Sequence, residues 1–133
     1  MTRATRRSIC PVACSLDLLG DRWTLLVIRD LFAGKSRFGE FLASPEGIAT
    51  NILVARLQGL QLAGLVATEP CSERAGLLRY RLTARGKSLL PVLAAIRDWG
   101  LAHIHGTEAK TRISAPLVGH AKRGDPRSGI LPA

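Results

Sequence analysis

Residues 47–83, GIATNILVARLQGLQLAGLVATEPCSERAGLLRYRLT, carry the most information about the fold, because their hydrophobic period changes partway along. In the first half, apolar residues recur at three- and four-residue spacings, which predicts a helix from Ile48 to Ala63-Gly64. Its apolar stripe consists of Ile52, Leu53, Leu57 and Leu60. The opposite face carries Asn51, Val54, Ala55 and Gln58, and we expect this face to point into solvent.

The second half of the stretch has the two-residue period of β-strands. Residues 65–68 (LVAT) are strand-like, and residues 78–82 (LRYRL) alternate apolar with basic side chains. The segment 70–76 between them is rich in turn-forming residues. The two short strands are therefore expected to pair as a hairpin.

A shorter helix is predicted just before residues 47–83. Phe38, Phe41 and Leu42 share one face, Ser36 is the candidate cap, and residues 44–47 (SPEG) form a turn. A short helix, a turn, a longer helix and a hairpin follow one another in the winged helix-turn-helix. In that layout the longer helix enters the major groove of DNA, and the hairpin tip reaches the backbone or the minor groove.

Further helices flank this unit. Pro11 favours the first position of a helix that Gly20 ends, and Asp21 is the candidate cap of a second helix running to Phe32. Thr83 is expected to cap a last helix that continues to about His105, with a kink at Pro91. The predicted fold class is mainly α with a small β-hairpin, a winged helix-turn-helix with N- and C-terminal dimerisation helices. Its expected divisions are a basic arm (1–9), one domain (10–106) and a disordered basic tail (107–133).

Length and charge limit the possible functions. The 133 residues fit one domain, and 47% hydrophobic with 22% charged residues is globular composition. Nineteen Lys and Arg against ten Asp and Glu give a net charge of +9, which favours polyanionic partners, nucleic acid first, although a merely solubilising surface is the alternative. The absence of a long apolar run and of a signal-like start predicts a cytoplasmic protein with no membrane partner.

Five ordered motifs between residues 10 and 105 resemble HxlR-type regulators, within the MarR-like winged-helix group. They are Cys10-Pro11-Val12 with LDLLGDRWTLL (16–26), Gly34-x-x-Arg37-Phe38-Gly39-Glu40-Phe41, GIATNIL-x-x-RL (47–57), Gly64-Leu65-Val66, and Tyr80-x-Leu82-Thr83-x-x-Gly86-x-x-Leu89-x-Pro91. The resemblance implies a dimeric DNA-binding transcription regulator. The chain departs from the family pattern at Ala49, where a capping Ser is common and Thr50 could substitute, and at the apolar Val54 and Ala55.

The candidate DNA-binding residues come from the helix-turn-helix and the hairpin. They are Ser36, Arg37, Thr50, Asn51, Val54, Arg56, Gln58, Arg74 and Arg79. Asn51 can pair with adenine through two hydrogen bonds, with Thr50 and Gln58 as secondary readers, and Val54 can touch a thymine methyl. Capping or simple exposure to solvent is the alternative for Asn51.

The remaining candidates would contact phosphate or, in the case of Arg74, the minor groove or phosphate. Ser36 and Arg37 open a helix whose N-terminal N–H groups favour an anion, although Arg37 could be an ordinary surface residue. Arg56 could bind phosphate, but we favour an internal ion pair with a carboxylate such as Glu40. Arg74 at the hairpin tip and Arg79 behind it are the wing candidates, where Glu69 and Glu73 dilute the charge and a simply solvated hairpin is the alternative.

Two helices are candidate dimer surfaces: the first helix and the helix that contains Leu89–Trp99. Their apolar faces exceed what a small core needs, although some of these residues must pack within the subunit. A twofold dimer would set two recognition helices one DNA turn apart, about 34–36 Å, and would bind a palindrome.

Cys10 is the candidate redox-sensing residue, because a thiol at a helix N-terminus has its thiolate stabilised by the helix dipole, here with Arg6 and Arg7 nearby. The resemblance agrees, since some family members sense reactive species through a cysteine that matches Cys10. Cys14 lies one turn on, a spacing that rarely forms a disulfide within a helix. The alternative is that these are small buried thiols with no signalling function, with Cys71 a bystander on the wing loop.

No catalytic motif, cofactor fingerprint or zinc-ligand spacing occurs in the sequence, so neither an enzyme nor a cofactor is expected. The leading hypothesis is a sequence-specific transcription regulator, a dimeric repressor of a palindromic operator that responds to a reactive small molecule. The alternative hypothesis is a winged-helix protein-interaction module with incidental affinity for DNA.

Overall fold

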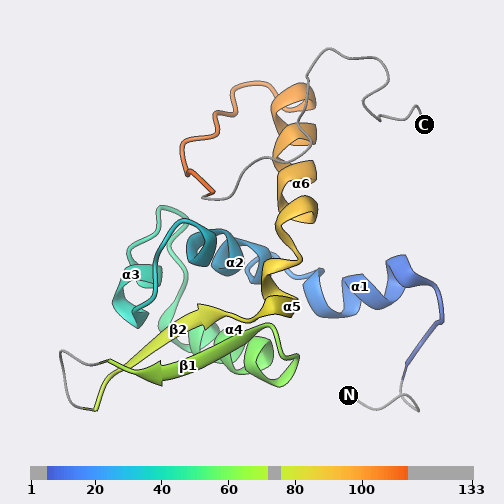
Figure 1. Ribbon diagram of the computed structural model, residues 1–133. Helices are drawn as coiled ribbons and strands as arrows, with labels where there is room; N and C mark the ends of the chain where they lie inside the picture. Colours follow the sequence, from blue (N-terminus) through green and yellow to red (C-terminus); the bar gives the residue numbers. More distant parts are fainter. Residues whose placement is uncertain (1–5, 72–75, 114–133) are drawn as a thin grey trace.

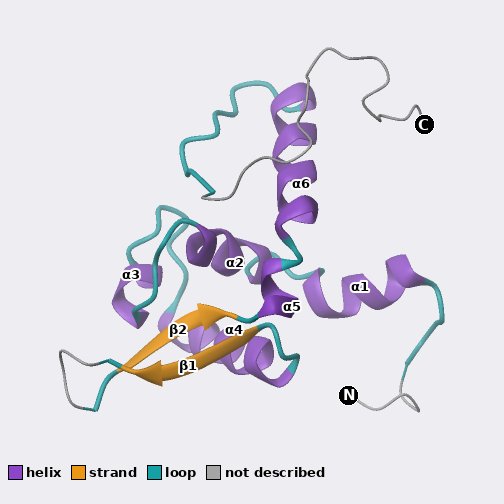
Figure 2. Ribbon diagram, viewed as in Figure 1, coloured by secondary structure: helices purple, strands orange, loops and turns teal. Residues whose placement is uncertain are grey.

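The computed structural model describes residues 6–71 and 76–113. Within them, the helices and the one hairpin follow one another in the predicted order (Figures 1 and 2). The elements are α1 (Pro11–Leu19), α2 (Thr24–Phe32), α3 (Phe38–Leu42), α4 (Thr50–Leu62), β1 (Val66–Pro70), β2 (Leu78–Leu82), α5 (Ala84–Lys87) and α6 (Leu90–His103). The expectations for the start of the arm, for Arg74 and for the tail beyond residue 113 lie outside the described residues.

The ends of the first two helices follow from local chemistry. Pro11 opens α1, and the N–H of Gly20 closes it by donating to the carbonyl of Leu16 at 2.8 Å. Trp23, not the predicted Asp21, holds the cap position of α2. The Asp21 carboxylate nevertheless satisfies the helix start from outside, because it accepts the N–H groups of Trp23 (2.9 Å) and Thr24 (3.0 Å).

The predicted cap of α3 is wrong. Arg37, not Ser36, occupies the cap position of this helix. The carboxylate of Glu40, one turn into the helix, accepts the backbone N–H groups of Ser36 (2.8 Å) and Arg37 (2.9 Å). Because Glu40 reaches back in this way, the helix start is satisfied without the Ser36 hydroxyl.

The single kinked helix predicted after Thr83 is two helices, α5 and α6. The Thr83 hydroxyl accepts the N–H of Gly86 at 3.0 Å, so Thr83 caps α5 as predicted. The chain then turns at Ser88 and Leu89, and Pro91 lies in the first turn of α6. Proline is accommodated there because a first-turn N–H has no helical partner to lose, which explains a break in place of a kink.

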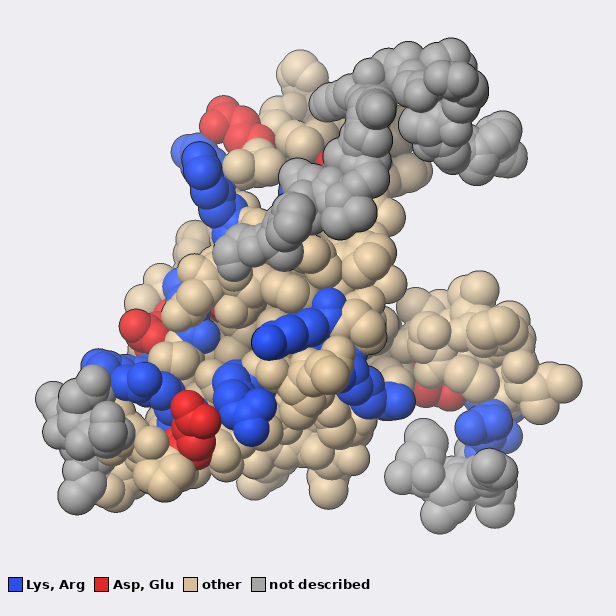
Figure 3. All heavy atoms as spheres, viewed as in Figure 1, with Lys and Arg blue, Asp and Glu red and all other residues tan. Residues whose placement is uncertain are grey.

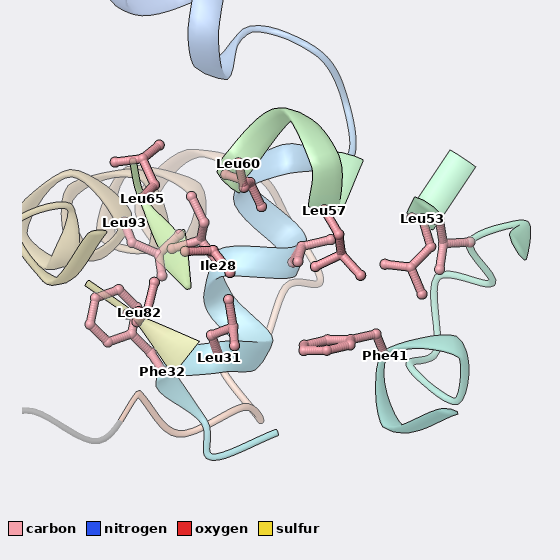
Figure 4. Packing of buried hydrophobic residues seen from close by; sticks show 13 residues of the cluster. Ile28, Leu31, Phe32, Phe41, Leu53, Leu57, Leu60, Leu65, Leu82 and Leu93 are labelled. Atoms are coloured by element: carbon pink, nitrogen blue, oxygen red, sulfur yellow. The ribbon is translucent and has the colours of Figure 1, made fainter. Parts of the chain in front are cut away.

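The hydrophobic core gathers around α2 (Figure 4). Phe41, Ile28 and Leu53 are fully buried, and they bring α3, α2 and α4 together. The hairpin is antiparallel with Val66 opposite Leu82, and both of these side chains enter the core. Tyr80 meets the ring of Phe41 edge-on at 6.1 Å between centroids, so the wing is packed directly on the helix-turn-helix.

Two helices stand apart from this core. In Figure 1, α1 extends to one side of the domain and α6 rises away from it. No residue of α1 is buried, and Leu93 is the one buried residue of α6. The core therefore comes mainly from residues 24–93.

Candidate nucleic-acid interface

The two faces of α4 differ sharply in exposure. Leu53, Leu57 and Leu60 are buried against the core, as Figure 4 shows. The outward residues Thr50, Asn51, Val54, Ala55 and Gln58 are exposed. The predicted outward orientation is confirmed, and this helix presents amide, hydroxyl and methyl groups that can meet base edges in a groove.

The N-terminus of α4 has no side-chain cap. Ala49 holds the cap position, and Thr50 is already the first helical residue, so the expectation that Thr50 replaces a capping Ser is wrong. Gly47, whose φ is +73°, reverses the chain just before, and its N–H donates to the Ser44 carbonyl at 3.1 Å. The Thr50 and Asn51 side chains thus open the exposed face of the helix without being used for capping.

Arg56 has an internal partner, but not the predicted one. Its Nε lies 2.9 Å from Oδ2 of Asp21, an ion pair whose geometry is not that of a hydrogen bond. Burial alone would raise the pKa of Asp21, but hydrogen bonds from Thr24 and from the N–H of Trp23, with the charge of Arg56, hold that pKa below its usual value. Arg56 therefore ties α4 to the start of α2, and the expected pairing with Glu40 is wrong.

A buried ionic cluster that the sequence analysis missed braces the turn before α4. Asp30, nearly fully buried in α2, accepts a hydrogen bond from the hydroxyl of Ser44, which in turn accepts one from Lys35 Nζ at 2.6 Å. Arg29 donates two 2.8 Å hydrogen bonds to the carboxylate of Glu46 and two, of 2.9 and 3.1 Å, to that of Asp30. These contacts join the end of α2 to the turn that leads into α4.

Charge-assisted hydrogen bonding shifts the ionisation of this cluster. The paired Arg29 holds the pKa of Glu46 below its usual value, and Glu46, followed by Asp30, raises the pKa of Arg29 further. The Arg29 and Glu46 side chains are thus both charged at neutral pH. The signal available in the sequence was an aspartate inside an otherwise apolar helix face.

The wing is fastened to the helix-turn-helix through its backbone. The N–H of Tyr80 in β2 donates to the carbonyl of Ser36 at 2.7 Å. Ser36 is half-buried, whereas Arg37 beside it is exposed and accessible to a phosphate. Their binding to DNA stays a prediction.

Cys71 and Arg79 lie together at the loop end of the hairpin, Cys71 directly after β1 and Arg79 in β2. Cys71 is 5% exposed, which agrees with the alternative of a small buried thiol. Arg79 is half-buried, and its Nη2 lies 3.9 Å from the Cys71 sulfur. Arg79 is thus engaged near the loop end of the wing, so only part of its side chain is available to DNA.

The two N-terminal thiols differ in exposure. Cys10 is exposed at the cap position of α1, and its N–H donates to the Ser8 hydroxyl at 3.0 Å. Cys14 is half-buried, and its thiol donates to the Ser8 carbonyl at 3.2 Å. Both thiols are free, and Cys10 is the more accessible to a reagent.

Basic side chains spread over the outer face of the hairpin and α5. Figure 3 shows blue groups from the wing across to α5, interrupted by one red group. Among residues 6–71 and 76–113, no cluster of three metal-ligating side chains occurs. Nor does this part of the chain contain a helix long and apolar enough to cross a bilayer.

Helices α2, α3 and α4 form a three-helix unit in which one face of α4 is exposed, and the β1–β2 hairpin packs on this unit as a wing. This arrangement defines the winged helix-turn-helix class of DNA-binding proteins. Residues 18–108 match the HxlR-like helix-turn-helix family, and the chain belongs to that family. The resemblance seen in the sequence motifs is thereby confirmed, and transcription regulation through DNA is the function of the class.

Known relatives agree with this assignment. The uncharacterised HTH-type transcriptional regulator sll1512 of Synechocystis sp. is 38% identical over 92 residues, 69% of this chain and 68% of the relative. The crystal structure of PA1607, a candidate transcription factor, is 39% identical with a TM-score of 0.70, over 97% of this chain and 84% of that one. The redox regulator HypR in its reduced form is 28% identical with a TM-score of 0.63, and the match covers 70% of this chain and 92% of the HypR chain.

Proposed function

We propose that the protein is a dimeric repressor that binds a palindromic operator, with α4 in the major groove and the wing on the flanking backbone. The observation that carries the proposal is the exposed outer face of α4, with Asn51 and Gln58 opposite the buried leucines. The apolar Val54 between them suits a thymine methyl group. Repression follows when such a dimer occupies a promoter.

Asn51 provides the test of base reading. Binding to duplexes from upstream of the protein's own gene is measured by fluorescence anisotropy. Asn51→Ala should weaken specific binding by about 1–3 kcal/mol, roughly 5- to 150-fold, because it removes a side chain suited to two hydrogen bonds with adenine. Gln61→Ala, an exposed amide at the far end of the same helix, is the matched control and should change little.

The protein-interaction alternative predicts a different result. If both Asn51→Ala and Arg74→Ala leave DNA affinity unchanged, the exposed face of α4 does not read DNA. In that case the exposed Val54 and Leu62 would favour a protein partner. Absence of any salt-sensitive binding of the wild type to duplex DNA would contradict the repressor proposal outright.

The proposed dimer rests on the apolar faces of α1 and α6. Val12 and Leu16 on α1 are 66% and 54% exposed, and Ile96 and Trp99 on α6 are 51% and 61% exposed. Light scattering should give a mass twice the 14.3 kDa of the chain. Ile96→Asp should give a folded monomer, while Arg97→Asp, at the neighbouring position, should remain more dimeric; a wild-type monomer would contradict the proposal.

The proposed inducer is an oxidant or electrophile that reacts with Cys10. Two observations support it: the thiol is exposed at a helix start, and the structural relative HypR is a redox regulator. Peroxide, a quinone or an aldehyde should release the wild type from DNA. Cys10→Ser should resist release, whereas Cys71→Ala, which alters a buried thiol, should not; if the wild type ignores all three reagents, Cys10 is not a sensor.

A further inference from the structure

A group of three exposed basic residues, here named the basic ridge, lies outside the helix-turn-helix: Arg81 of β2 with Arg85 and Lys87 of α5. We propose that the basic ridge binds the sugar–phosphate backbone of duplex DNA beyond the segment that α4 reads. The inference rests on the proposed DNA-binding function and adds to the contacts of α4 and the hairpin tip a surface at the end of the hairpin away from its tip.

The fold turns these three side chains outward. Leu82 enters the core, so the strand alternation directs Arg81 to the opposite face of the hairpin. In α5, Gly86 is buried against the carbonyl of Leu65, which leaves Arg85 and Lys87 exposed on either side of it. Figure 3 shows basic groups on this face of the hairpin and α5.

The ridge adjoins the end of the recognition helix. The Cδ of Arg85 would lie 3.7 Å from a Cβ placed on Gly64, the residue that follows the C-cap of α4. The aliphatic stem of Arg85 therefore lies beside this helix terminus. The ridge is thus next to the C-terminal end of the helix that we propose to enter the groove, and this proximity favours DNA over a separate acidic partner.

The charge of the ridge is only slightly neutralised. Arg81 pairs with Glu69 at 3.3 Å, but both side chains are about half exposed, and such pairs are weak. Arg85 and Lys87 make no ion pair with any described residue. Guanidinium and ammonium groups are suited to phosphate, and duplex DNA offers a negative charge about every 1.7 Å along its axis.

Because the ridge is proposed to contact phosphates and not base edges, it should add affinity that depends on DNA length and salt but not on sequence. Each phosphate contact contributes about 0.9 to the slope of log affinity against log salt. Removing Arg85 and Lys87 should then lower the slope by about 1.8 for each bound subunit. The ratio of wild-type to variant affinity for DNA should therefore fall about 12-fold per subunit between 50 and 200 mM KCl.

The test compares two duplexes, the minimal operator defined by footprinting and the same operator lengthened by about one helical turn on each side. Anisotropy titrations in 50–200 mM KCl are made with the wild type and with Arg85→Ala/Lys87→Ala. The control is Lys110→Ala/Arg112→Ala, which removes the same charge from exposed residues after α6. The ridge variant should lose the gain from the longer duplex while still preferring the operator over unrelated DNA.

Two failures can be told apart. If no variant and no duplex shows specific binding, the proposed function itself fails. If specific binding persists and the ridge variant matches the control on both duplexes and in salt slope, the ridge does not bind DNA, and a solubilising surface or an acidic partner replaces the inference.

Discussion

The junction between the wing and α5 depends on Gly86, where any larger residue would collide with its neighbours. A Cβ added to Gly86 would overlap the carbonyl oxygen of Leu65, and it would lie 2.9 Å from Cδ2 of Leu82 and 3.1 Å from the Leu65 carbonyl carbon. Ordinary carbon contacts begin near 3.5 Å. The obstacle is mainly backbone, so a rotamer change cannot relieve it.

The expected cost of Gly86→Ala can be worked from these contacts. Overpacking of this kind costs about 1–3 kcal/mol, and more where the backbone must move. The same Leu65 oxygen accepts the N–H of Thr83 at 3.1 Å, so its displacement threatens a hydrogen bond worth about 1 kcal/mol. The gain in helix propensity offsets up to about 1 kcal/mol. We expect a net loss of about 1–4 kcal/mol in the free energy of unfolding.

Urea unfolding at one fixed protein concentration measures this loss, since dimerisation would make the midpoint depend on concentration. Gly59→Ala is the matched control: a Cβ at that exposed helical position meets nothing within 4 Å. It should stabilise the fold by about 1 kcal/mol. If Gly86→Ala unfolds within about 0.5 kcal/mol of the wild type, the packing argument is wrong.

Three further predictions concern polar contacts. Because Arg29 holds the pKa of Glu46 below its usual value, the stabilisation by Glu46 is fully present above that usual value and is lost as pH falls through the lowered pKa. Urea midpoints of wild type and Glu46→Gln should therefore differ at pH 7 and converge on acidification; a constant difference would refute this. Thr83→Ala should cost about 1 kcal/mol, and Thr83→Ser much less, because only the former loses the acceptor for the Gly86 N–H. Arg56→Gln should cost less than about 1 kcal/mol and leave the salt slope of DNA binding unchanged, because Arg56 pairs with Asp21; a reduced slope would show a phosphate contact.

The local features of the fold were predictable, because each depends on neighbours within one or two turns. The leucine spacing of α4, the alternation in β2 and the capping by Thr83 are of this kind. The break before α6 was not predicted. Pro91 indicates that a regular helix is disturbed, but its effect as a kink or as a new helix start depends on how Gly86 and Leu93 pack.

The partners of charged residues were not predictable, because they are set by tertiary contacts. Arg56 faces Asp21, which lies 35 positions earlier, while the carboxylate chosen from the sequence, Glu40, caps its own helix. Asp30 meets Ser44, 14 positions away, and nothing in the spacing of the two marks the contact. Hydrophobic period predicts which face is buried, but it does not specify which polar groups meet beneath the surface.

Periodicity also leaves open whether an apolar face packs within a subunit or between subunits, and α6 shows how the structure separates the two. Leu93 faces the core of its own chain. Val92, Ile96 and Trp99 form a second stripe about a quarter turn away, at four- and three-residue spacings, and all three are exposed. One stripe is enough to dock the helix, so the second is surplus to the subunit. That surplus, together with the unburied face of α1, is the physical reason to expect a second copy of the chain, and Ile96→Asp tests it without disturbing Leu93.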